Sequence, residues 1–103
     1  MATLTIVYWR DIPAQVIAER GRGRKREQAK IVLAERFEKA IDAAAMRGGS
    51  TETDDYLADW RRSDPVDCGD DLDAEAQAVA DRLEGDYDAA RLRDLIANEG
   101  RAG

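Results

Sequence analysis

The acidic side chains of residues 64–75 are the strongest candidates for binding a metal ion. This segment has the length of a calcium-binding loop, and Asp64, Gly69 and Glu75 occupy its first, sixth and twelfth positions. The third and fifth positions require side-chain oxygen ligands, but Val66 and Cys68 stand there. Capping of a following helix explains the acids with fewer assumptions, because carboxylates stabilise a helix N-terminus. We therefore predict no metal site.

Cys68 is the strongest candidate for a nucleophile, and it is the chain's single cysteine. The neighbouring aspartates should raise the pKa of its thiol, and the sequence contains no histidine that could activate it. A phosphate-binding glycine loop is also missing, because Gly21-Arg22-Gly23 has neither the required spacing nor the helix-opening context. The remaining acids are too many and too scattered to define an acid–base pair. The sequence thus predicts no catalytic residue and no cofactor, which favours a non-enzymatic protein.

A cluster of cations at residues 20–26 is the most distinctive local feature. Five of its seven positions are basic, namely Arg20, Arg22, Arg24, Lys25 and Arg26. Phosphate contacts from this cluster, with stacking on Tyr8 and Trp9, would suit nucleic acid. The charge distribution disfavours that function, because residues 1–48 carry a formal charge of +4 and residues 49–103 one of −10. Three interpretations stay open: a docking surface for an acidic protein partner, a nucleic-acid site, and a solvated connector.

Two tryptophans lie next to arginines, in Trp9-Arg10-Asp11 and in Trp60-Arg61-Arg62. An aromatic side chain at the end of a strand or helix usually fills the core and less often anchors an interface. The first segment follows a strand pattern, so its polar residues would lie at a turn. The residues that we single out for a protein interface are Tyr8, Trp9, Arg10, Asp11, Trp60 and the five cations of residues 20–26.

The elements that must position these residues begin with a strand at residues 3–9, which are rich in β-branched and aromatic types. Leu4, Ile6 and Tyr8 would share one face of this strand, and Thr5, Val7 and Trp9 the other. Pro13 should end the pairing, because it has no N–H to donate. A second strand is expected at residues 14–19, beside the first.

Helices are expected over the rest of the chain. Residues 27–47 predict one long amphipathic helix that ends at Gly48-Gly49, with its apolar face formed by Leu33, Phe37, Ala40, Ile41 and Ala44. Residues 50–62 predict a short helix before Pro65, and an acidic connector follows. Residues 72–84 predict a third helix, ended by Gly85, and a fourth should begin at Asp86 or Asp88. This order predicts an α+β fold, in which an N-terminal two-stranded β-hairpin or small sheet packs against three to four helices.

Size and composition limit the class of protein. A chain of 103 residues predicts a single domain. One cysteine permits no internal disulfide, which is typical of a reducing compartment. We find neither a signal-peptide pattern nor an apolar run long enough to span a bilayer, so we expect a cytoplasmic protein without membrane contact.

The segment LTIVYWRDIPAQV, residues 4–16, resembles the opening of a small bacterial family described as "virulence factor". Further similar segments are ERF at 35–37, AID at 40–42, AAMR at 44–47 and DDYLADWR at 54–61. The resemblance covers residues 3–63, and we expect residues 64–103 to form a helical extension that varies within the family. It implies a cytoplasmic protein, with related domains fused to scaffold-like and helical-repeat segments and some members encoded beside folate- and corrinoid-dependent methyl-transfer genes. It implies no catalytic residue.

Two functional classes follow from these observations. The first is a non-enzymatic accessory protein that docks on a larger protein partner. The second is a subunit or ligand-binding component of a folate- or corrinoid-linked methyl-transfer system, with nucleic-acid binding through residues 20–26 as a further alternative. Small size, split charge and the missing catalytic groups favour the first class.

Overall fold

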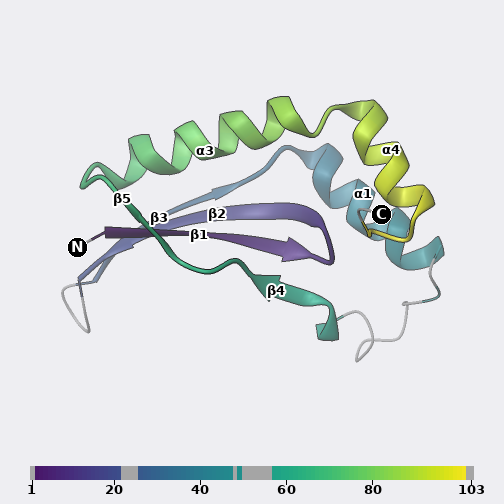
Figure 1. Ribbon diagram of the computed structural model, residues 1–103, viewed down its shortest axis with the longest axis horizontal. Coiled ribbons are helices and arrows are strands. Elements are labelled where there is room, and N and C mark those ends of the chain that lie inside the picture. Colours follow the sequence, from purple (N-terminus) through teal and green to yellow (C-terminus); the bar gives the residue numbers. More distant parts are fainter. Residues whose placement is uncertain (1, 22–25, 48, 50–56, 102–103) are drawn as a thin grey trace.

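The computed structural model describes residues 2–21, 26–47, 49 and 57–101, and all structural statements refer to these residues. They form five strands and three helices (Figure 1). In chain order these are β1 (Ala2–Trp9), β2 (Ile12–Arg20), β3 (Glu27–Val32), α1 (Glu35–Arg47), β4 (Trp60–Arg62), β5 (Val66–Cys68), α3 (Leu72–Asp86) and α4 (Ala89–Ala97). The expected α+β class with N-terminal strands is therefore confirmed.

The strands form one antiparallel sheet in the order β3-β2-β1-β4, with β5 also paired to β1. The hairpin of β1 and β2 turns through Arg10 and Asp11, because Trp9 is paired with Ile12. The register shifts between Val7 and Tyr8, where Gln15 and Pro13 are their respective partners. Pro13 thus lies inside β2, contrary to the expected break, because this irregularity removes the need for a regular ladder bond there.

The expected single helix over residues 27–47 is wrong in its first part. Residues 27–32 form β3, which pairs along β2 with Ala29 opposite Ala18 and Ile31 opposite Val16. Pairing with β2 satisfies the backbone of this segment and buries Ala29, while the β-branched pair Ile31-Val32 favours an extended chain. The helix begins only at Glu35. The five residues of the predicted apolar face are nevertheless buried: Phe37, Ala40, Ile41 and Ala44 lie on α1, and Leu33 lies just before it.

The expected helix through Arg62 is also wrong at its end, since Trp60–Arg62 form β4 opposite Val7–Trp9. Ser63 prolongs this pairing, because its backbone N–H donates to the Ile6 carbonyl and its hydroxyl accepts from the Ile6 N–H, both at 2.9 Å. The acidic connector likewise contains a strand, β5, which pairs with Ala2–Leu4. Residues 50–56, where that helix was expected to begin, lie outside the described residues.

The two C-terminal helices follow the capping signals of the sequence. The Asp71 carboxylate accepts from the Ala74 N–H at 3.2 Å, and the Asp88 carboxylate accepts from the Arg91 N–H at 2.8 Å. Gly85 does not end α3 as expected, because the helix continues to Asp86 and its last backbone bond is donated by Tyr87.

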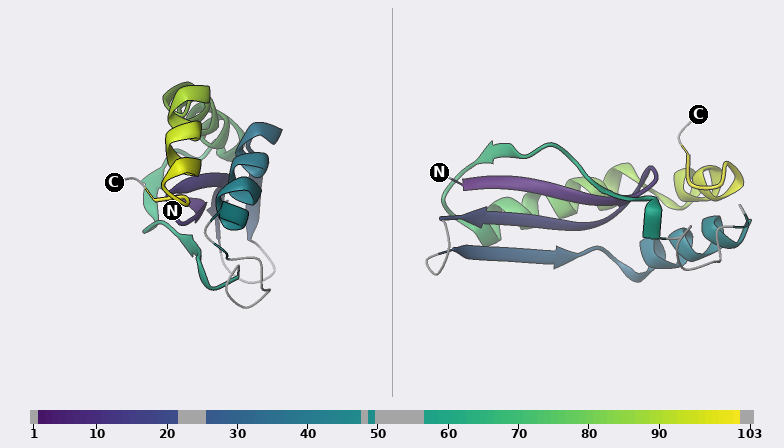
Figure 2. Two further views of the ribbon diagram at one scale, coloured as in Figure 1. Left: turned by 90° about the vertical axis from the view of Figure 1, so that its right-hand side faces the viewer. Right: turned by 90° about the horizontal axis from the view of Figure 1, so that it is seen from below.

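The core lies between the sheet and the helices. Helix α3 runs along one face of the sheet over β2 and β3, while α1 and α4 pack on each other at one end (Figure 1). The right-hand view of Figure 2, seen from below, shows no described helix on the opposite face of β1, β2 and β3. The largest fully buried side chains include Trp9, Ile12, Val16, Phe37 and Ile41. Within the described residues, no helix has both the length and the apolar character that a membrane span requires.

Candidate docking groove beside helix α3

The hairpin tip consists of Arg10 and Asp11, and most of its polar groups bind other residues of the molecule. Trp9 is completely buried, and the Arg10 guanidinium lies 4.6 Å from the centre of its ring. The Arg10 side chain is only 9% exposed, and its Nε donates to Asp59 at 3.0 Å. A further Arg10 nitrogen donates to the Glu99 carbonyl. Arg10 therefore joins the tip both to the segment before β4 and to the C-terminal turn.

Backbone bonds strengthen the same junction. The Arg10 N–H donates to the Asp59 carbonyl at 3.0 Å, and the Asp11 N–H donates to the Gly100 carbonyl at 2.8 Å. Trp60 lies opposite Trp9 across the β1–β4 pair and is half-buried. The structure thus gives the Trp9-Arg10-Asp11 segment a structural role, and its predicted part in a docking surface stays a prediction.

The described ends of the cationic cluster are paired with acids. Arg20 binds the Glu27 carboxylate and donates to the Asp70 carbonyl at 3.3 Å, while Arg26 lies 3.4 Å from the Glu19 carboxylate. The other members of the cluster, Arg22, Arg24 and Lys25, lie outside the described residues. These ion pairs lower the charge that the ends of the cluster offer to a ligand.

Tyr8 keeps part of its side chain on the surface, unlike its neighbour Trp9. The Arg61 guanidinium lies 4.5 Å from the centre of the Tyr8 ring. Arg61 itself is held by the Asp11 carboxylate at 3.2 Å and by the Arg10 carbonyl at 2.9 Å. Burial raises the pKa of Tyr8 above its ordinary value, and the nearby Tyr87 raises it further. The Tyr8 hydroxyl is therefore a protonated hydrogen-bond donor at neutral pH.

A groove lies along the side of α3, between this helix and the strands β1 and β5. Because α3 lies over β2 and β3, it leaves the same face of β1, β4 and β5 largely uncovered. The hollow there has a volume of about 370 Å³. Its floor is apolar and includes Val66, which is 56% exposed, and Ile6 and Val79, which are half-buried. The lining residues are Leu4, Ile6, Ser63, Asp64, Val66, Asp67, Cys68, Glu75, Val79 and Arg82.

Helix α3 presents a regular stripe to this groove. Glu75, Val79 and Arg82 follow one another at spacings of four and three residues, which places them on one side of a helix. They lie beside the buried stripe formed by Leu72, Ala76, Ala80 and Leu83. One side of α3 therefore packs on the sheet, while the adjacent side faces the groove.

The groove is acidic at one end and basic at the other. Asp64, Asp67 and Glu75 lie towards β5, and Arg82 lies towards the C-terminal end of α3. The Glu75 carboxylate lies so close to Gly69 that a Cβ atom there would be 2.8 Å from its Oε1. Burial, and then the charges of Glu75, Asp67 and Asp70, raise the pKa of the Cys68 thiol. The thiol therefore stays protonated at neutral pH, which disfavours nucleophilic chemistry there.

The part of the chain that the structure describes contains no assembled set of metal ligands. No three side chains of the types His, Cys, Asp and Glu come together there as a metal site. The acids of residues 64–75 are instead spread over β5, a cap and the first turns of α3.

A further hollow, of about 260 Å³, lies between β3 and the start of α3 and is lined mostly by polar residues. Two other hollows are smaller or shallower than the groove. One, of about 210 Å³, lies between α1 and β2 and includes Trp60. The other, of about 360 Å³, is an open furrow between α1 and α4 with Arg36, Lys39 and Arg93 among its lining residues. None of the three combines an uncovered sheet face with a polarised charge pattern, so the groove beside α3 is the best candidate site.

Sequence reasoning singled out Tyr8 but not Glu75, Val79 or Arg82 as surface residues. The spacing of these three residues within the expected third helix was a visible signal. Its meaning depended on which half of the sheet the helix covers, and that is a tertiary relationship.

The fold and the site define a class of protein: a small α+β chain in which a helix covers only part of one face of a five-stranded sheet. A family model described as "Virulence factor" matches residues 7–96, and the chain belongs to this family. The match confirms the resemblance inferred from the N-terminal segments and includes α3 and α4. No curated protein and no solved structure matches the chain.

Proposed function

We propose that this protein is a non-enzymatic accessory protein that docks on a larger protein partner through the groove beside α3. The observation that carries this proposal is the uncovered half of the helix-bearing sheet face, where Ile6, Val66 and Val79 form an apolar floor. Exposed apolar surface with a charged rim is typical of protein interaction sites.

The direction of α3 relative to the uncovered strands favours a helix of the partner as the docked segment. The side of α3 that carries Glu75, Val79 and Arg82 is parallel to the uncovered strands, so a second helix could lie beside α3 and complete the layer. Its apolar side would cover Val66 and Ile6. A cation on it would suit Glu75 and Asp67, and a carboxylate would suit Arg82.

Site-specific photo-crosslinking in the producing cells tests this proposal. A photoreactive residue at position 66 should form a crosslink to one defined protein, and Val79→Asp should abolish it. The matched control is position 32, because Val32 is also an exposed strand valine, 66% exposed, and lies outside the groove. Equal crosslinking from positions 32 and 66, or a crosslink at position 66 that survives Val79→Asp, would contradict docking in the groove.

The other functional classes stay predictions. A methyl-transfer subunit would also need a partner, so identification of the protein crosslinked at position 66 separates that class from a purely scaffolding one. Nucleic-acid binding through residues 20–26 predicts a complex with labelled RNA that weakens steeply with salt. The ion pairs of Arg20 and Arg26 with acids weigh against that class.

A further inference from the structure

We propose that Arg82, which lines the basic end of the groove, forms an anion-binding subsite with Tyr8 and Tyr87 just beyond that end, and that this subsite takes a carboxylate side chain of the docked partner. The inference rests on the proposed function for the source of the carboxylate. The subsite itself can be tested on the isolated protein.

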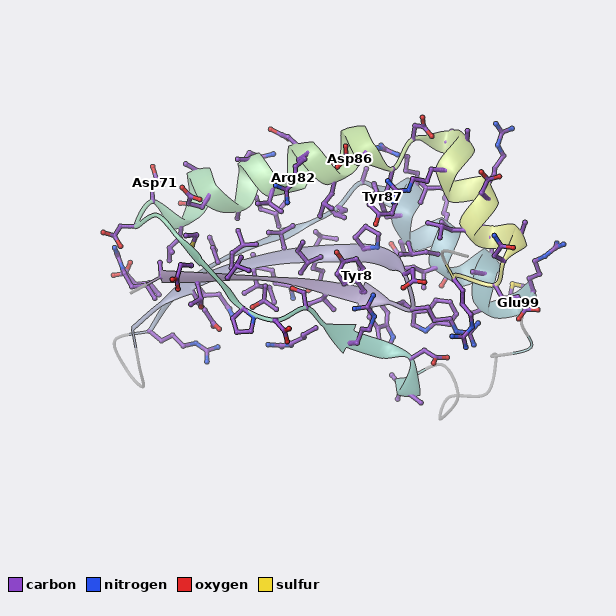
Figure 3. All side chains as sticks on the ribbon, in the orientation of Figure 1. Tyr8, Asp71, Arg82, Asp86, Tyr87 and Glu99 are labelled. Carbon is purple, nitrogen blue, oxygen red and sulfur yellow. The ribbon has the colours of Figure 1, made fainter. Side chains whose placement is uncertain are left out.

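The first argument is that three hydrogen-bond donors lie in one region of the molecule, none of them bonded to an acceptor among the described residues. Arg82 belongs to α3, Tyr87 follows that helix and Tyr8 lies on β1, and Figure 3 shows the three between α3 and the sheet. Within the described residues, neither tyrosine hydroxyl has a hydrogen bond, and the Arg82 guanidinium has neither a hydrogen bond nor an ion pair. No buried side-chain polar atom in this part of the chain lacks a partner, so the two hydroxyls are open to solvent or to a ligand.

The second argument is that both tyrosine rings are backed by guanidinium groups. Arg61 lies 4.5 Å from the centre of the Tyr8 ring, and Arg91 lies 4.0 Å from the centre of the Tyr87 ring. Tyr8 and Tyr87 are close enough to influence each other electrostatically, and Arg82 acts on Tyr8 as well. A cation on a ring makes its hydroxyl a better donor, so the pair favours a negatively charged ligand.

The acidic residues near this subsite lower its net positive charge, but they do not occupy the position proposed for the ligand. Asp11 is paired with Arg61 at 3.2 Å. The Asp86 carbonyl accepts from Arg91 at 3.2 Å, and the Asp86 side chain lies at the end of α3 near Tyr87 (Figure 3). Arg82 is therefore the cation of this group that is left to pair with a ligand.

The third argument concerns the class of anion. A carboxylate matches the planar guanidinium with two hydrogen bonds and can accept a further one from a phenol. The apolar floor at Ile6 and Val79 would contact the aliphatic part of a glutamate side chain. Asp64, Asp67 and Glu75 in the same groove would repel a polyanion such as RNA, so a singly charged carboxylate is the favoured ligand.

Nuclear magnetic resonance of the full-length ¹⁵N-labelled chain, with sodium acetate as the probe and sodium chloride as the reference, tests the subsite. Acetate should cause saturable shifts of the Arg82 Nε–H and the Tyr87 amide, with a dissociation constant of the order of millimolar. Arg82→Ala should weaken this binding about tenfold or more, and Tyr8→Phe by about threefold to tenfold. The matched control is Arg93→Ala, because Arg93 is an exposed arginine on α4 outside the groove, and it should leave the affinity unchanged.

Three outcomes would overturn the inference: no saturable shift, equal losses from Arg82→Ala and Arg93→Ala, or inorganic phosphate that binds tenfold more tightly than acetate. The crosslinking at position 66 decides the proposed function separately. If the crosslink forms equally well in Arg82→Ala, docking stands and the carboxylate assignment is wrong. If acetate binds at Arg82 but position 66 forms no crosslink, the subsite stands and the docking function is wrong.

Discussion

Gly100 lies directly against the indole of Trp9: a Cβ atom at Gly100 would be 2.8 Å from Cζ3 of that ring. Gly100 has a φ of +90°, and its N–H donates to the Leu95 carbonyl at 2.7 Å. The turn that follows α4 therefore closes over the buried tryptophan of the hairpin tip. This contact links the N-terminal family segment to the last helix.

Gly100→Ala should lower the free energy of unfolding by about 2–5 kcal/mol, because the new methyl group meets Trp9 and the positive φ is unfavourable for alanine. Urea denaturation measures this loss. Gly49→Ala is the control, since Gly49 has a φ of +74° but no atom within 4 Å of the added Cβ. It should cost only about 1–2 kcal/mol. Equal losses would mean that the Trp9 contact contributes nothing.

Arg10→Ala should lower the free energy of unfolding by about 2–3 kcal/mol, because it leaves the Asp59 carboxylate without its cation in a partly buried place. Arg10→Gly should be less harmful than Arg10→Ala, since Arg10 has a φ of +53°. Arg62→Ala on β4 should change stability by less than about 0.5 kcal/mol. Thermal and urea unfolding of the three variants would check this order, and a harmless Arg10→Ala would show that the tip is held by backbone bonds alone.

Phe37→Ala should lower the free energy of unfolding by about 3–5 kcal/mol, because Phe37 is 1% exposed and is the largest side chain on the buried face of α1. Such a loss is comparable with the whole stability of many small domains. Met46→Ala on the same helix removes a side chain that is 72% exposed and should have little effect. A loss below about 1 kcal/mol at Phe37 would contradict the packing of α1.

The free energy of unfolding should fall at alkaline pH, and ionisation of the Tyr8 hydroxyl should account for part of this loss. Its pKa is raised in the folded protein, chiefly by burial, so the unfolded chain loses this proton at a lower pH than the folded one. The resulting stabilisation is complete below the ordinary tyrosine pKa of about 10 and is lost as the pH rises through the folded value. Urea denaturation between pH 8 and 11 should show a smaller alkaline loss for Tyr8→Phe than for the unchanged protein. If Tyr8→Phe and the unchanged protein lost the same free energy of unfolding over this pH range, burial would not raise the pKa of Tyr8.

Cys68 should react slowly with a disulfide reagent at neutral pH, because burial and the charges of Glu75, Asp67 and Asp70 raise the pKa of its thiol. Glu75→Gln should lower that pKa and speed the reaction, as followed by the absorbance of the released thiolate. Asp73→Asn is the matched control, since Asp73 lies in the same first turns of α3 but is not among the charges that raise the pKa of the thiol. An equal acceleration by both variants would indicate a general charge effect and not a contact with Glu75.

Local signals in the sequence predicted a large part of the fold. The β-branched run before Trp9 predicted β1. Aspartates before the two C-terminal helices predicted capping, and the side chains of Asp71 and Asp88 cap α3 and α4. The spacing of Phe37, Ala40, Ile41 and Ala44 predicted a buried helical face, and all four are buried on α1, whereas Leu33 is buried but precedes the helix. These features depend on neighbours within a few residues, which is why pattern and capping rules found them.

The errors lie where a distant strand decides the conformation. Residues 27–32 have a helical pattern of polar and apolar side chains, but the edge of β2 offers them a full ladder of backbone hydrogen bonds. Trp60–Arg62 are extended because Val7–Trp9 lie beside them, and nothing close to Trp60 in the sequence indicates that pairing. In both places tertiary pairing outweighs local preference.

By itself, the sequence determined the class of fold, the separation of charge between the two parts of the chain and the lack of histidine chemistry. The tertiary structure alone decided that Trp9 and Arg10 hold the molecule together and that the open surface lies beside α3. The physical reason is that a helix can cover only part of a five-stranded sheet. Which strands α3 leaves uncovered depends on contacts between residues far apart in the chain, and no local pattern encodes them.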